Sequence, residues 1–141
     1  MKRTTALAFL AATLISMCSA LAHAQADEFK VPFNFIVGNQ TLPADTYRVG
    51  YAAGNILLIS SRDGSSSATI STFATYDRTP ARGTLLFARY GNRYFLHKVL
   101  SRDLATNAEI PKSGIEKQVQ IQDAQLSHSR TVAVLYVPAQ R

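Results

Sequence analysis

The clearest structural signal in the chain is VPFNFIVGNQTLPADTYRV, residues 31–49. Large apolar side chains occupy every second position around its start, so one face of an extended strand is apolar throughout. These residues are Phe29, Val31, Phe33, Phe35 and Val37. Gly38-Asn39 then interrupts the run, residues 42–45 (Leu-Pro-Ala-Asp) turn the chain, and the alternation resumes at Tyr47. The pattern predicts a strand, a turn and a second strand, and it contains no catalytic motif.

Short β-rich segments separated by turn residues make up most of the remaining chain. They span residues 55–60, 68–74, 84–90, 93–100 and 130–137. A turn about every 8–12 residues is typical of antiparallel β folds. We therefore expect a mainly β fold, an antiparallel β-sandwich or small barrel of about seven strands with one short helix near the C-terminus.

The segments 84–90 and 93–100 are joined by Gly91-Asn92, a pair that suits a two-residue hairpin turn. The register that follows pairs Tyr90 with Arg93, Arg89 with Tyr94, Phe87 with Leu96, and Leu86 with His97. Apolar residues lie on both faces near the middle of this hairpin. We expect it to lie inside a sheet, with only its tip in solvent.

A helix is predicted after a loop at residues 107–113. Ser113 and Glu116 have the spacing of a capping box, in which the Ser side chain caps the helix and a Glu follows three residues later. Residues at roughly helical spacing follow the box: Ile115, Val119, Gln122 and Leu126. They predict a short amphipathic helix from Gly114 to about Gln125.

The first residues have the pattern of a cleaved secretory signal peptide. Lys2-Arg3 precedes an apolar run at residues 6–15, and Ala22-His23-Ala24 is a small-x-small cleavage site. The expected organisation is a signal peptide at 1–24 and a single β-rich domain at 25–141, with cleavage after Ala26 as the alternative. A membrane anchor is a poorer interpretation because the run is short for about 30 Å of hydrocarbon.

Cys18 offers a lipoprotein alternative, but the preceding Met17 is not the small residue that a lipobox requires. Cys18 is the only cysteine in the chain. A cleaved chain would therefore be exported to the periplasm or the medium without disulfides, and its stability would come from a packed core.

Removal of Lys2 and Arg3 lowers the formal net charge from +6 to about +4, and the remaining basic residues are scattered. Nucleic-acid binding needs a concentrated basic stripe, so we expect no nucleic-acid partner. No segment after the signal is long and apolar enough to cross a membrane as a helix. No motif indicates a cofactor.

Several segments carry a resemblance to a known family. The chain reads VPFNFIVG at 31–38 and LPADTYRV at 42–49, with RYGNRYFL at 89–96 and IPKS at 110–113. These resemble a V-P-F-x-F-x-V-G…L-P-A-G-x-Y-x-V signature of small, uncharacterised secreted proteins found mainly in soil bacteria. The resemblance covers about residues 29–117, and it implies export and one β-rich domain but no catalytic residues. Asp45 stands where that signature has Gly, and Asp tolerates a positive φ better than most residues.

Evidence for an active site is weak. His97 and His128 are the only histidines beyond the expected signal, and neither lies in a metal-binding spacing, so no metal site is predicted. No G-x-S-x-G occurs, and a hydrolase site around His97 stays an alternative. A glycosidase would need two facing carboxylates. The candidate aspartates fall in turns or loop ends, where Asp caps the backbone: Asp45, Asp63, Asp77 and Asp103.

Tyrosines beside arginines are the better functional signal. The predicted hairpin tip carries Arg89, Tyr90, Arg93 and Tyr94. Such a cluster can stack on sugars or anchor a protein partner, although it can also protect a sheet edge by cross-strand packing. We expect a non-enzymatic binding module for an unknown protein, glycan or other envelope component. The alternatives are a small hydrolase near His97 and a structural subunit of an envelope assembly.

Overall fold

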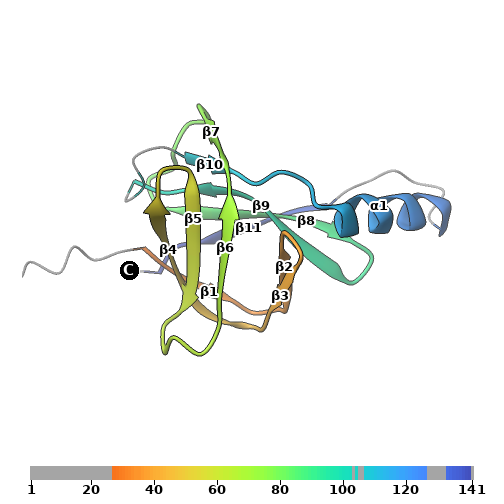
Figure 1. Ribbon diagram of the computed structural model, residues 1–141, viewed down its shortest axis with the longest axis horizontal. Helices are drawn as coiled ribbons and strands as arrows, with labels where there is room; N and C mark the ends of the chain where they lie inside the picture. Colours follow the sequence, from red (N-terminus) through yellow and green to blue (C-terminus); the bar gives the residue numbers. More distant parts are fainter. Residues whose placement is uncertain (1–26, 103, 105–106, 127–132, 141) are drawn as a thin grey trace, which may run out of the picture.

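A computed structural model describes residues 27–102, 104, 107–126 and 133–140 of the protein (Figure 1). It confirms the predicted fold class, because the described chain is mainly β, curls into a half-barrel and carries its one helix near the C-terminus. The expected signal peptide and cleavage sites, together with Cys18, Asp103 and His128, lie outside the described residues.

The first sheet contains four antiparallel strands in the order β1-β4-β5-β6. They are β1 (Glu28–Val31), β4 (Asp45–Ala53), β5 (Ile56–Ser61) and β6 (Ser67–Ser71). Burial alternates along β5, where Leu57 and Ile59 are buried and Ile56 and Leu58 are half-buried. One face of this sheet therefore points into the core and the other is only partly covered.

The second sheet has the strand order β11-β8-β9-β10-β7, with β2 and β3 attached through β9. Its strands are β2 (Phe35–Val37), β3 (Gln40–Leu42), β7 (Phe73–Thr75), β8 (Thr84–Tyr90), β9 (Arg93–Leu100), β10 (Asn107–Glu109) and β11 (Ala133–Pro138). In Figure 1 strands β8, β9 and β11 run across strands β4, β5 and β6 of the first sheet. The prediction of a loop from residue 107 is wrong at its start, because β10 pairs there with both β7 and β9.

The opening segment differs from the single strand that its alternation predicts. β1 pairs with β4 in the first sheet, whereas β2 pairs with β3 and β9 in the second. The break falls at residues 32–34, where Pro32 has no N–H to donate to a ladder. Asn34 Oδ1 instead accepts a hydrogen bond from Ala44 N at 2.9 Å, which ties the break to the turn before β4.

The main core lies between the two sheets and is built largely from aromatic rings. Phe35, Tyr47 and Phe87 are each at most 1% exposed. Phe35 makes edge-to-face contacts with Tyr47 and Phe87, at ring centroid distances of 5.1 and 5.3 Å. The opening segment thus supplies the aromatic centre that joins the sheets.

The β8–β9 hairpin has the predicted turn and register near its tip. Tyr90 pairs with Arg93 and Arg89 with Tyr94. The register then shifts between Leu86 and Phe87, and Leu86 pairs with Lys98, so the predicted pairing of Leu86 with His97 is wrong. The bulge falls at His97, between the paired residues Leu96 and Lys98, and the His97 side chain lies on the side of the hairpin next to the C-terminal helix, where it contacts Glu116.

Helix α1 (Gly114–Leu126) begins at the predicted cap, where Ser113 Oγ accepts a hydrogen bond from Glu116 N at 3.1 Å. Its buried face differs from the predicted one. Glu116 and Val119 are its buried residues, whereas Ile115 and Leu126 are exposed, Leu126 by 83%. Across the described residues, no helical segment has the length and apolar character needed to cross a membrane.

Candidate functional site

The four residues of the predicted binding cluster lie on two faces of the β8–β9 hairpin. Directly opposed residues of an antiparallel pair share a face, so Arg89 lies with Tyr94 and Tyr90 lies with Arg93. The first pair lies on the side of Phe87 in the main core, and the second on the side of helix α1. Figure 1 shows the hairpin and α1 extending from the same side of the half-barrel.

Arg89 and Tyr94 belong to a stack that Phe33 completes. The rings of Phe33 and Tyr94 are stacked at a centroid distance of 4.0 Å, and the Arg89 guanidinium carbon lies 5.6 Å from the Tyr94 centroid. Arg89 Nε also donates a hydrogen bond to Gly91 O at 2.7 Å. The backbone turn and the aromatic ring therefore hold the guanidinium of an exposed arginine in one orientation.

Tyr90 is buried beneath helix α1. It is 3% exposed and belongs to a small second core with Ala88, Phe95 and Val119. Its hydroxyl donates a hydrogen bond to Glu116 Oε1 at 3.1 Å. Burial raises the pKa of Tyr90, and the nearby Glu116 carboxylate raises it further. The hairpin surface open to a partner is thus formed by Arg89, Arg93 and the half-buried Tyr94.

The same Glu116 oxygen contacts His97 Nε2 from the neighbouring strand. The His97 side chain is 26% exposed, whereas the Glu116 side chain is 4% exposed. A carboxylate beside an imidazole is found in nucleophilic active sites, where it orients the histidine. In the part of the chain that the structure describes, no serine or threonine hydroxyl is hydrogen-bonded to His97, and the contact between His97 and Glu116 joins β9 to α1.

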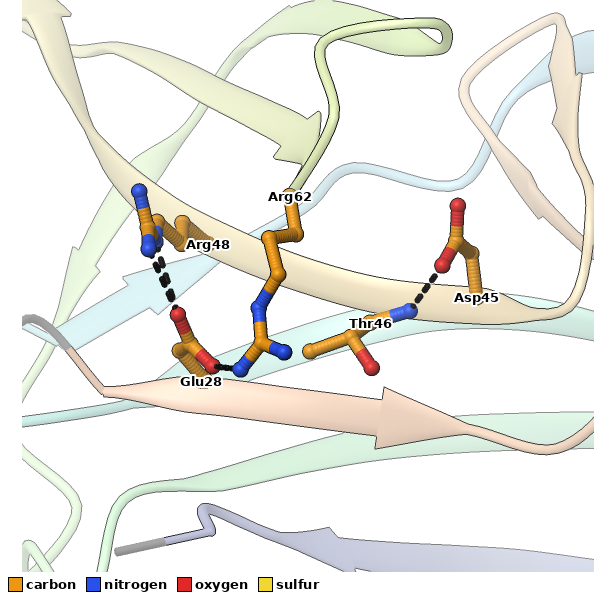
Figure 2. Close-up of polar contacts among 5 residues, drawn as sticks. All are labelled: Glu28, Asp45, Thr46, Arg48 and Arg62. Carbon is orange, nitrogen blue, oxygen red and sulfur yellow. Dashed lines mark hydrogen bonds and ion pairs between the residues drawn. The ribbon is translucent and has the colours of Figure 1, made fainter.

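A second charged cluster lies on the outer side of the first sheet (Figure 2). Arg48 donates hydrogen bonds from Nε and Nη2 to Glu28 Oε1, at 2.9 and 2.7 Å, and Arg62 binds Glu28 Oε2. These two arginines lower the pKa of the Glu28 carboxyl, Arg62 having the larger effect. Glu28 O also accepts a hydrogen bond from Gln140 N at 2.6 Å. The cluster ties both ends of the described chain to the first sheet.

Three of the four aspartates considered as glycosidase carboxylates are described by the structure, and they accept hydrogen bonds from backbone amides or from lysine. Asp45 Oδ1 accepts from Thr46 N at 2.6 Å (Figure 2). Asp63 Oδ1 accepts from Ser65 N at 3.0 Å, and this bond and those with nearby serine hydroxyls lower its pKa to about 2. Asp77 Oδ2 accepts from Lys98 Nζ at 2.6 Å.

Two residues of the site have contacts that the sequence pattern does not predict. Glu116 was identified only as half of a capping box, yet its carboxylate joins α1 to β8 and β9. Phe33 was identified only as one position in an alternating strand, yet it lies at the break between sheets and packs on Tyr94. Over the described ranges, no group of three or more His, Cys, Asp or Glu side chains is placed to hold a metal ion.

Comparison with known proteins adds no relative, since no family model, curated protein or solved structure matches the chain.

Proposed function

We propose that the protein is an exported, non-enzymatic β module that binds a protein, glycan or other component of the cell envelope through its β8–β9 hairpin. The N-terminal signal pattern and the resemblance to small secreted proteins support export. The binding surface proposed consists of Arg89, Arg93 and Tyr94 at the hairpin tip.

The observation that carries this proposal is the fixed guanidinium of Arg89. Exposed arginine side chains normally sample many rotamers, and ordering one on binding costs free energy. At Arg89 the bond to Gly91 O and the contact with Tyr94 reduce that cost before any partner arrives. Arginine and tyrosine are also enriched among the residues that dominate binding energies.

Capture from an envelope extract tests the proposal. The immobilised protein is expected to retain a partner that a variant with Arg89→Ala and Arg93→Ala no longer retains. A variant with Arg78→Ala and Arg82→Ala is the control, because both residues are exposed and the net charge changes equally. Equal capture by the wild type and both variants would show that the hairpin is not the binding surface.

The contact between His97 and Glu116 favours a small hydrolase as the second candidate. This activity would require a nucleophile beside the imidazole in addition to the carboxylate. The test is hydrolysis of p-nitrophenyl acetate by the wild type and by His97→Gln. Turnover that disappears in the variant would favour the hydrolase, whereas equal background rates would reject it.

A further inference from the structure

We infer that the β8–β9 hairpin recognises carboxylate side chains of an acidic protein segment, with Arg89 as the residue that positions the first carboxylate. This inference rests on the proposed binding function and adds the class of its partner. It concerns the tip of the hairpin, from Arg89 to Tyr94.

The arginines of the hairpin differ from those of the first sheet in whether they form ion pairs. Arg48 and Arg62 already bind the Glu28 carboxylate. Among the residues that the structure describes, no carboxylate lies within ion-pair distance of Arg89 or Arg93. The hairpin therefore presents two arginines without an ion pair in the described chain, although the Asp123 carboxylate lies near the same turn, with Oδ1 3.6 Å from the position that a Cβ on Gly91 would take. Two such cations complement a negatively charged partner.

The orientation of Arg89 selects a planar anionic group. Because its Nε donates to Gly91 O, the two terminal amino groups remain for a ligand. A carboxylate accepts two parallel hydrogen bonds from such a fork. Other exposed cations such as Lys30 and Arg78 have no comparable hydrogen bond to fix their head groups, within the described chain.

The aromatic packing at the tip favours a polypeptide over a glycan. Sugar binding by aromatic residues needs a free ring face, but the Tyr94 ring already stacks on Phe33 and lies close to Arg89. The Tyr90 ring is buried under α1. What remains accessible is a narrow two-stranded tip with a cation on each face, since Arg89 and Arg93 lie on opposite sides of the hairpin.

Binding of poly-L-glutamate to the purified protein at low salt tests the inference. Loss of a charge-assisted bidentate contact is expected to weaken this binding about tenfold in Arg89→Gln. Arg89→Lys keeps the charge but lacks the fork, so it should lie between the wild type and Arg89→Gln. Arg78→Gln removes the same charge from an exposed site and should change binding less than about twofold.

Three results would overturn the inference. One is no binding of poly-L-glutamate by the wild type. Another is equal weakening by Arg89→Gln and Arg78→Gln, which would indicate net charge alone. The third is tighter, Arg89-dependent binding of polygalacturonate or inorganic polyphosphate, which would assign the tip to a different partner class.

The two proposals fail in distinguishable ways. Hairpin-dependent capture from the envelope extract without poly-L-glutamate binding would reject the acidic partner and retain the proposed function. Arg89-dependent poly-L-glutamate binding without hairpin-dependent capture would reject the envelope partner while retaining carboxylate recognition by the tip.

Discussion

The Tyr90 hydroxyl donates a hydrogen bond to Glu116 Oε1 at 3.1 Å, and this bond joins strand β8 to helix α1. His97 reaches the same oxygen from β9. Val119 is the only apolar residue of α1 that is buried, so apolar packing alone gives the helix little hold on the sheet. The attachment of α1 therefore depends on a buried carboxylate with two partners.

Substitution Glu116→Ala is expected to loosen α1. It leaves the buried Tyr90 hydroxyl and the His97 ring without their acceptor, and unmade hydrogen bonds of buried groups cost about 1–3 kcal/mol. The free energy of unfolding should fall by that amount, and amide exchange should accelerate over residues 114–126. Gln118→Ala is the control on the exposed face of α1. Equal behaviour of the two variants would mean that the carboxylate does not hold the helix.

Buried tyrosines should make the protein sensitive to alkaline pH. Burial raises the pKa of Tyr47 to about 12, and it raises that of Tyr90 as well. A folded-state pKa above the unfolded value of about 10 means that folding favours the protonated phenol. The resulting stability is complete below about pH 10 and is lost as pH rises through the folded-state value.

Denaturant titrations from about pH 8 to about pH 12, on either side of the ordinary tyrosine pKa of about 10, measure this loss. Tyr90→Phe keeps the ring but has no proton to release, so its stability should decline less steeply than that of the wild type. Tyr76→Phe is the matched control, because Tyr76 is 99% exposed. A wild-type decline that neither Tyr47→Phe nor Tyr90→Phe reduces would exclude these phenols as its source.

The sequence predicts the β elements and turns well where local chemistry determines them. Gly91-Asn92 needs a positive φ, and Gly91 has φ of 58° in the turn between β8 and β9. The alternation of residues 29–37 correctly identifies the core side chains, since period two marks one face of an extended chain. It cannot reveal that β1 and β2 belong to different sheets, because Phe29 and Phe35 face the same core from either side of the break.

The candidate site was less predictable because it depends on tertiary contacts. The bulge at His97 is a mismatch between two strands and has no signature in either strand alone. Helical spacing predicted Ile115 and Leu126 as inward residues. Instead, the face of α1 that carries Glu116 lies toward the sheet, where Glu116 contacts Tyr90 and His97. The spacing of apolar residues does not encode this orientation.

The Glu28 cluster should contribute to stability at neutral pH and lose that contribution in acid. Arg62 and Arg48 lower the pKa of the Glu28 carboxyl, so the charged form is favoured in the folded state. The contribution is present above the ordinary pKa of about 4.3 and declines as pH falls through the lower, folded-state value. Glu28→Gln should reduce the difference in stability between pH 7 and pH 3, and high salt should reduce the effect.

An exposed glutamate provides the control for this prediction. Glu109→Gln alters a carboxylate that lies 3.8 Å from Lys98, away from the arginines. Its pH dependence should follow the wild type more closely than that of Glu28→Gln. Identical acid profiles for Glu28→Gln and the wild type would show that the arginine contacts have no net effect on folding.

Alanine at Gly38 is expected to be more destabilising than alanine at other turn glycines. Gly38 has φ of 61°, and a Cβ there would lie 2.7 Å from Ile70 Cδ1. Gly54 has φ of 51° but open space around its Cβ position, so Gly54→Ala should cost only the left-handed conformation, about 1–2 kcal/mol. Gly50 has neither constraint, so Gly50→Ala should be near neutral. Denaturant unfolding of the three variants gives the ranking. A Gly38→Ala cost no larger than that of Gly54→Ala would mean that the Ile70 side chain moves away from the new methyl group without loss of stability.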